Sequence, residues 1–185
     1  ACLMDTPASQ FRGGSAILKK DVEVLCREAM GELLGIAESE RIFFTSGATE
    51  SMNTVLGGLD YGEKGSSILV TQTEHNSVLR PVYNLEQLRE HPVLVVKCTI
   101  IREFVKRHGL ILIVDVSQSA GCIPVDADKW EADALIFTGH KSLMGIQGIG
   151  GFYVGSGIEL KPLKYGGTGR NSAQLTYENK DYEYE

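Results

Sequence analysis

The stretch "ALIFTGHKSLMGIQGIGGFYVG", residues 134–155, decides the fold. An apolar run over 134–138 leads directly into Gly139-His140-Lys141-Ser142. A lysine at the end of a buried strand is unusual, because burying an unpaired ammonium group costs free energy. We therefore expect the end of this strand to be a functional position.

Similar apolar runs alternate with helical patterns along the rest of the chain. Strands are predicted at 41–45, 67–72, 93–98, 110–116 and 134–138, and helices at 15–36, 47–59, 78–91 and 100–109. The first helix carries an apolar stripe at three- and four-residue steps, made of Leu18, Val22, Leu25, Ala29 and Leu33. Most strands are apolar throughout, which is typical of a parallel sheet covered by helices on both faces, so the predicted class is α/β.

One junction is anomalous. Almost no residues separate the strand at 93–98 from the helix at 100–109, whereas such a connection normally needs about two to six residues. Either a stretch is absent near Cys98-Thr99, or the two elements are assigned wrongly.

Composition and charge exclude several classes of protein. The 185 residues suffice for one domain or slightly more, and the net charge of −6 argues against nucleic acid as the main partner. No apolar run approaches the roughly 20 residues of a membrane span, and the N-terminus shows no signal-peptide pattern, so we expect a soluble cytoplasmic protein. The four cysteines have no CxxC spacing, which indicates neither a metal site nor a disulfide framework.

Polar residues follow four of the predicted strands. Ligands bind at the carboxyl ends of the strands in an open parallel sheet, so these residues are the candidates for a site. Ser46-Gly47-Ala48-Thr49 begins a helix, where free N–H groups and the helix dipole favour an anion such as phosphate. The other candidates are Glu74, His75, Asn76, Asp115, Gln118, His140 and Lys141.

This combination suits pyridoxal phosphate as the cofactor. The cofactor needs a lysine for a Schiff base, an acid at the pyridinium nitrogen, a stacking ring and small residues around the phosphate. Asp115 would keep the ring nitrogen protonated, Gln118 would reach the ring oxygen and His75 would lie over the ring. A poorly solvated, cation-rich pocket would make Lys141 lose its proton readily.

Each residue also has an ordinary structural interpretation. A strand-end aspartate or "GAT" can cap a helix, a lysine can lie in a solvated loop, and a histidine can pack beside a strand. Their coincidence at one sheet edge is what favours a cofactor site. Two other phosphate-binding motifs do not fit the sequence. A Walker A loop would require glycine at positions 135 and 140, which are Leu135 and His140, and a dinucleotide fingerprint would require glycine at position 153, which is Tyr153.

Five motifs, in order along residues 12–172, resemble the cysteine desulfurase and selenocysteine lyase family of class V aminotransferase-fold enzymes. They are "FFTSGATESMN", "TEHNSVLRPVYNLE", "VDVSQSAGCIPVD", "FTGHKSLMGIQGIGGFYV" and "LKYGGTGRNS". The resemblance implies a pyridoxal-phosphate type I fold with a seven-stranded, mainly parallel sheet, and a homodimer with its sites near the subunit interface. It implies a large cofactor-binding domain over residues 1–165, with residues 166–185 beginning the connection to a small C-terminal domain.

The resemblance also assigns roles to individual residues. Lys141 matches the Schiff-base lysine, and His75 matches a ring-stacking histidine that transfers protons. Asp115 and Gln118 match the residues that hold the ring nitrogen and the ring hydroxyl. The phosphate contacts match Ala48, Thr49, Thr138, His140 and, donated by the neighbouring subunit, Thr168.

The reaction implied by the resemblance releases sulfur from L-cysteine, giving alanine and an enzyme persulfide for an acceptor protein, commonly in iron–sulfur cluster assembly. The chain departs from the family in three places. None of its cysteines falls at the position of the nucleophile, and the small domain with its carboxylate-binding arginine is absent. The family has a further strand and an asparagine in the interval near Cys98-Thr99, where this sequence has no residues for them. The family's usual N-terminal segment is missing or reduced to "CLMDTPAS".

Three explanations of these departures remain open: omitted stretches of a longer chain, a fragment, or a true truncation. The first is favoured, because loss of a central strand would leave backbone groups unpaired. Besides a desulfurase, two alternatives remain: another class V enzyme (selenocysteine lyase, epimerase or aminotransferase), or a truncated, non-catalytic binder of pyridoxal phosphate.

Overall fold

The structure is a computed structural model that describes residues 16–62, 67–71, 73–89, 92–96 and 101–163. Four strands form the larger sheet in the order β1-β6-β5-β4. They are β1 (Ile42–Thr45), β6 (Gly150–Val154), β5 (Ala134–Thr138) and β4 (Ile113–Asp115). β4 is parallel to β5, and β6 runs antiparallel to both β5 and β1. Three of these four strands therefore point the same way, and the predicted α/β class is confirmed.

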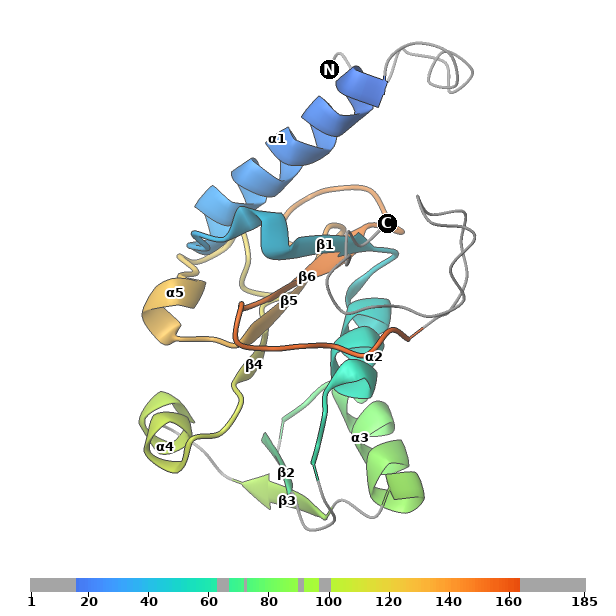
Figure 1. Ribbon diagram of the computed structural model, residues 1–185, viewed down its shortest axis with the longest axis vertical. Helices are drawn as coiled ribbons and strands as arrows, with labels where there is room; N and C mark the ends of the chain where they lie inside the picture. Colours follow the sequence, from blue (N-terminus) through green and yellow to red (C-terminus); the bar gives the residue numbers. More distant parts are fainter. Residues whose placement is uncertain (1–15, 63–66, 72, 90–91, 97–100, 164–185) are drawn as a thin grey trace.

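A separate two-stranded sheet is formed by β2 (Ile68–Thr71) and β3 (Val93–Val96). The two strands are parallel and in register, with Ile68 opposite Val93. Figure 1 shows this pair at the far end of the molecule from helix α1.

The helices are α1 (Ala16–Leu34), α2 (Ala48–Gly58), α3 (Asn76–Arg89), α4 (Ile101–His108) and α5 (Ala127–Trp130), with a 3-10 turn η2 (Ser39–Arg41). α2 and α3 pack together on one face of the sheets, and α5 lies on the opposite side (Figure 1).

The central strand β5 separates two hydrophobic cores. Successive strand residues point to opposite faces, so Ala134 and Ile136 join the core beneath α2 and α3, while Leu135 and Phe137 join the second core. All five residues of β5 are buried, which explains the continuous apolar run in the sequence.

The predicted helix at 15–36 exists, but most of its apolar stripe is not covered. Leu25 is 62% exposed and Leu33 is 44% exposed, whereas Leu34 is fully buried. α1 extends outward from the body of the protein, and Met30 and Leu34 near its C-terminal end meet the core (Figure 1). An amphipathic pattern indicates a face that can be buried, and among the described side chains of α1 the fold buries this C-terminal part.

The other predicted elements are present where the structure describes them, although residues 72, 90, 91, 97, 98 and 100 of the predicted strands and helices lie outside the described residues. α3 begins at Asn76 rather than at Val78. The apolar run begins at Leu110, but β4 begins only at Ile113. The N–H of Leu112 donates a hydrogen bond to the Asp133 carboxylate at 2.8 Å instead of to a neighbouring strand. β6 and α5 were not predicted. None of the helices in the described part of the chain combines the length and apolar character needed for a bilayer crossing.

Candidate active site

The start of α2 lies against the end of β5. Gly47 precedes α2 with a φ of 150°, a conformation that favours glycine, and no side chain caps the helix. A Cβ placed on Gly47 would come near only the Thr138 hydroxyl, at 3.9 Å, among the described residues. The N–H groups of Ala48 and Thr49 therefore stand at an uncapped, uncrowded helix start, the arrangement that binds anions.

A carboxylate already lies near this helix start. Glu50 accepts hydrogen bonds from the Ser46 N–H at 2.9 Å and from the Ser46 hydroxyl at 2.7 Å. A negative charge in the first turn complements the helix dipole. An incoming phosphate would consequently be held by the Ala48 and Thr49 N–H groups beside this carboxylate, and would need further donors.

Thr138 and His140 supply such donors at the end of β5. Thr138 is 2% exposed, and its hydroxyl lies 3.0 Å from Nδ1 of His140. This contact holds the imidazole next to the start of α2, since Thr138 is also the nearest side chain to Gly47. The predicted phosphate contacts from α2 and β5 are thus brought together.

Lys141 sits in a tight turn directly after His140. The turn is closed by a hydrogen bond from the Met144 N–H to the Lys141 carbonyl at 2.9 Å. The Ser142 hydroxyl donates to the Gln118 carbonyl at 3.0 Å. The lysine turn is therefore attached to the turn that follows β4, where Asp115 and Gln118 lie.

Asp115 ends β4 and shapes the turn that follows. Its Oδ1 accepts a hydrogen bond from the Ser117 N–H at 2.9 Å, and the aspartate side chain remains exposed. Ser117 itself is 3% exposed, and its hydroxyl has no hydrogen-bond partner among the described residues. A buried hydroxyl normally has a hydrogen-bond partner, so Ser117 is a candidate to bind a polar group near Asp115.

His75 has a structural role at the start of α3. Its Nδ1 accepts a hydrogen bond from the Ser77 N–H at 3.1 Å and lies 2.9 Å from the Ser77 hydroxyl. These contacts satisfy an otherwise free helix N–H in the manner of an N-cap. The stacking role assigned to His75 stays a prediction, and Thr168 lies outside the described residues.

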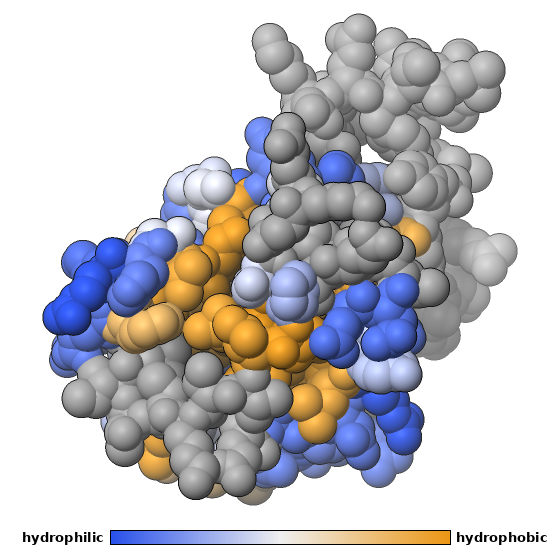
Figure 2. All heavy atoms as spheres, turned by 90° about the horizontal axis from the view of Figure 1, so that it is seen from below, coloured by the Kyte–Doolittle hydropathy of each residue, from blue (hydrophilic) through white to orange (hydrophobic). Residues whose placement is uncertain are grey.

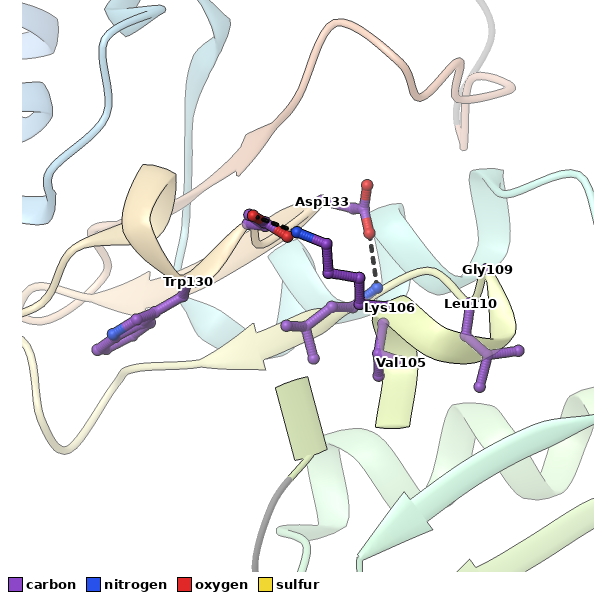
Figure 3. A pocket seen from close by; sticks show the side chains of 8 residues that line it. Val105, Lys106, Gly109, Leu110, Trp130 and Asp133 are labelled. Carbon is purple, nitrogen blue, oxygen red and sulfur yellow. Dashed lines mark hydrogen bonds and ion pairs between the residues drawn. The ribbon is translucent and has the colours of Figure 1, made fainter. Parts of the chain in front are cut away.

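The cavity seen from close by in Figure 3 is a different place. It has a volume of about 220 Å³ and lies between α4 and the segment that leads from α5 into β5. Leu112 and Asp133, which line the cavity, come just before β4 and β5. The cavity therefore lies at the amino ends of these parallel strands, whereas Lys141 follows the carboxyl end of β5. Lys106 is paired with Glu131 at 2.8 Å there.

Sequence reasoning assigned no role to three residues that help to build the site: Ser117, Ser142 and Gly150, which packs against Gly47. All three lie inside the quoted motifs "VDVSQSAGCIPVD" and "FTGHKSLMGIQGIGGFYV", but their contacts leave no pattern in the sequence. The described residues include no cluster of three or more metal-ligating side chains.

Comparison with protein families gives a match to the model described as aminotransferase class-V, in two segments, residues 18–100 and 94–185. The cysteine desulfurase IscS of Dictyoglomus turgidum is 28% identical over 191 residues, covering 83% of this chain and 48% of the relative. The cysteine desulfurase IscS of Serratia proteamaculans is 32% identical over 168 residues, covering 70% of this chain and 41% of the relative.

Solved structures give the same result. The apo cysteine desulfurase of Thermococcus onnurineus NA1 superposes with a TM-score of 0.70 at 25% identity, over 80% of this chain and 48% of that one. A structure described as SspA in complex with cysteine has a TM-score of 0.69 at 25% identity, over 83% of this chain and 56% of that one. The chain spans about half the length of the relatives that it matches.

Proposed function

The chain belongs to the class V aminotransferase family, and from this membership we propose that it binds pyridoxal 5′-phosphate at the Lys141 edge of its sheet and acts as a cysteine desulfurase. Its fold is the type I fold of pyridoxal-phosphate enzymes, as in the cysteine desulfurases that superpose on it. In the proposed reaction a cysteine thiol of the whole protein attacks the sulfur of L-cysteine, the C–S bond breaks with its electrons passing to the substrate carbon, and that carbon takes up a proton to give alanine. The thiol is left as a persulfide, whose outer sulfur passes to an acceptor protein.

One observation carries the proposal. The hydrogen bond from Ser142 to Gln118 at 3.0 Å attaches the turn of Lys141 to the turn that follows Asp115. Lys141 and Asp115 thereby follow the carboxyl ends of two adjacent parallel strands, where ligands bind, and this supports assigning both residues to one site.

The residues present fit the cofactor in chemical type. The uncapped start of α2 and the Thr138–His140 pair offer donors for a phosphate, and the buried hydroxyl of Ser117, near Asp115, makes no hydrogen bond within the described part of the chain. Bound pyridoxal phosphate would withdraw electrons from Cα of an attached amino acid and so make its proton acidic.

The chain's own groups would then have distinct tasks. Lys141 Nζ would hold the aldehyde carbon covalently, and later take up and return the Cα proton. The Asp115 carboxylate would face the ring nitrogen and keep it protonated, while Gln118 and His75 would hold the ring oxygen and the ring face. In a homodimer, Thr168 of one subunit would complete the phosphate site of the other.

Borohydride trapping tests the cofactor assignment. The protein is incubated with pyridoxal phosphate, reduced, digested and mapped by mass spectrometry. We expect one reduced adduct, on Lys141, and none in Lys141→Ala. The matched control Lys161→Ala removes an exposed lysine that lies 3.7 Å from Asp60, and it should leave the adduct unchanged. An adduct of equal yield on another lysine would refute the assignment.

The substrate is tested separately. Cysteine is supplied to the cofactor-loaded protein together with dithiothreitol, which reduces a persulfide to a thiol and sulfide, and alanine and sulfide are measured together. Both products in equal amounts support a desulfurase, whereas turnover of other amino acids without sulfide release indicates another class V activity. Cofactor binding without turnover of any amino acid would overturn the proposed reaction and leave a binding protein.

A further inference from the structure

The corner between β1 and α2 lacks the side chain that usually caps a helix. Serine, threonine, aspartate or asparagine normally occupies the N-cap position and accepts a hydrogen bond from an N–H of the first turn. Here the N-cap is Gly47, whose φ of 150° is a conformation that other residues rarely adopt. The N–H groups of Ala48 and Thr49 consequently remain available to an acceptor from outside the corner.

Glu50 supplies half of the arrangement known as a capping box. In a capping box, an N-cap serine or threonine accepts from the N–H three residues later, and a glutamate at that later position reaches back to the N-cap N–H. Glu50 stands at this third helical position, and its Oε2 accepts from the N–H of Ser46 at 2.9 Å and from the Ser46 hydroxyl at 2.7 Å. Both donors belong to the residue before the N-cap, so these bonds anchor the incoming chain and do not use the N–H groups of Ala48 and Thr49.

A second attachment holds the same corner from its buried side. The Gly47 N–H donates to the Thr45 hydroxyl oxygen at 3.3 Å, and that oxygen lies 2.7 Å from Oγ of Ser51, which is fully buried. The Ser46–Glu50 attachment is exposed by comparison. Its loss should therefore alter the corner while the core beneath α2 stays intact, because substitutions at exposed positions usually change stability little.

The charge of Glu50 and its hydrogen bonds have opposite effects on a phosphate at this helix start. Like charges repel, so the carboxylate by its charge alone weakens binding of a phosphate dianion near the first turn. Its hydrogen bonds fix the backbone that leads into the helix, and a ligand binds more tightly where the donors are already in position. Glutamine in place of Glu50 would keep an oxygen acceptor and remove the charge, so the two effects can be separated.

We propose that Glu50 is a positioning residue for the phosphate group of the cofactor: by anchoring Ser46 it holds the start of α2 in place, so that the N–H groups of the first turn are in position to bind the phosphate. The inference rests on the proposed binding of pyridoxal phosphate. Glu50 then affects the phosphate end of the cofactor and not the aldehyde end, which Lys141 holds.

Two aldehydes that differ at the phosphate end test this role. Deoxypyridoxal has the ring and aldehyde of pyridoxal phosphate but carries a methyl group instead of the phosphate-bearing arm, so it reports the aldehyde end alone. Both are titrated, by the absorbance of the Schiff base, into the wild type, Glu50→Ala and Glu50→Gln. We expect Glu50→Ala to weaken binding of pyridoxal phosphate about tenfold and binding of deoxypyridoxal less than about twofold, since only the phosphate uses the anchored corner. Glu50→Gln should bind pyridoxal phosphate at least as tightly as the wild type, because the acceptor is kept and the repulsion is removed.

The uncharged analogue needs a control for adventitious binding. Figure 2 shows apolar side chains uncovered in the middle of the face seen from the β2–β3 end, where an uncharged aromatic compound could bind. Such binding forms no Schiff base, so the signal that counts is the one that is absent in Lys141→Ala. Glu159→Ala removes an exposed carboxylate outside the corner and should leave both affinities unchanged.

Three results would overturn the proposal. Equal loss of both ligands in Glu50→Ala would mean that Glu50 supports the fold in general, and unchanged binding would mean that the Thr45 attachment suffices. Tighter binding of pyridoxal phosphate in both variants would show that Glu50 acts only through its charge. If the wild type forms a Schiff base with neither aldehyde, the proposed function fails and this inference with it, a result that is visible in the wild type alone.

Amide hydrogen exchange without cofactor gives an independent readout. In Glu50→Ala the Ser46 amide should exchange about tenfold faster than in the wild type, while the amides of the central strand β5 change little. Glu50→Gln should keep the wild-type exchange rate at Ser46. Equal exchange of the Ser46 amide in all three proteins would show that the carboxylate does not anchor the corner, whatever the titrations give.

Discussion

Gly150 at the start of β6 packs so closely against Gly47 at the start of α2 that a Cβ on Gly150 would lie 2.6 Å from the Gly47 Cα. It would also lie 2.8 Å from the carbonyl oxygen of Phe137. Both neighbours are backbone atoms, so neither can move aside as a flexible side chain would. This contact sets how near the uncapped helix start lies to Thr138.

Gly150→Ala should therefore destabilise the protein by about 1–3 kcal/mol, the usual cost of overpacking, and should weaken pyridoxal phosphate binding through displacement of α2. Urea unfolding and cofactor titration measure the two effects. Gly157→Ala is the matched control, since its Cβ would meet nothing within 4 Å. Equal stability of the two variants would show that the helix start is not held by this contact.

The Ser142–Gln118 hydrogen bond gives a second prediction. Ser142→Ala removes the donor to the Gln118 carbonyl and releases the lysine turn from the turn after β4. A hydrogen bond of this kind contributes about 0.5–1.5 kcal/mol, so we expect cofactor affinity to fall about two- to tenfold. Absorbance titration measures it, and Ser156→Ala, at an exposed position, should change nothing. If Ser142→Ala binds pyridoxal phosphate as tightly as the wild type does, the Ser142–Gln118 hydrogen bond does not help to position the cofactor site.

Two buried serines differ in whether their hydroxyls are paired, which gives a third prediction. Ser51 is fully buried and its Oγ lies 2.7 Å from the Thr45 hydroxyl, whereas the Ser117 hydroxyl has no partner among the described residues. In the 185-residue chain, Ser51→Ala should cost about 1 kcal/mol. Ser117→Ala should be neutral or stabilising by up to about 1 kcal/mol, because it removes an unpaired buried polar group.

One result of comparing the stabilities of Ser51→Ala and Ser117→Ala would contradict this prediction. If Ser117→Ala destabilises the chain as much as Ser51→Ala, the Ser117 hydroxyl already has a partner, and it could not be the free donor proposed for the site. Urea unfolding of both variants without cofactor decides this.

The ends of β1, β4 and β5 lie within one residue of the predicted ends, because each lies where a continuous apolar run stops. β5 matches its prediction, residues 134–138, since a strand buried on both faces must be apolar throughout. β6 was missed because its "GGFYV" begins with two glycines, which are required by close backbone contacts and disguise a strand. Contacts between motifs, such as Ser142 to Gln118, depend on tertiary packing and leave no local pattern.

The predicted role of His75 shows the limit of reading single residues. Its ring caps α3 through Ser77, whereas the ordinary structural interpretation drawn from the sequence was a histidine packed beside a strand. A motif can therefore identify the residue types of a site, while the contacts that each side chain makes depend on the tertiary structure.

A fourth prediction concerns the pH dependence of stability. Tyr153 in β6 is 5% exposed, and burial raises the pKa of its phenol above the usual 10.0. The carboxylates of Glu38 and Asp128 raise the pKa further, while Arg41 opposes them. In the unfolded chain the phenol loses its proton near pH 10, whereas in the folded protein it keeps the proton to higher pH.

Above about pH 10 the unfolded state therefore binds fewer protons than the folded state, so the free energy of unfolding must fall as the pH rises. Below that pH the group contributes no slope. Tyr153→Phe removes this contribution, and its stability should decline less than that of the wild type between about pH 9 and about pH 11. The control Tyr83→Phe changes a tyrosine that is 60% exposed and should keep the wild-type slope. If Tyr153→Phe declines as steeply as the wild type in urea unfolding across this range, burial of the neutral phenol is not what links stability to alkaline pH.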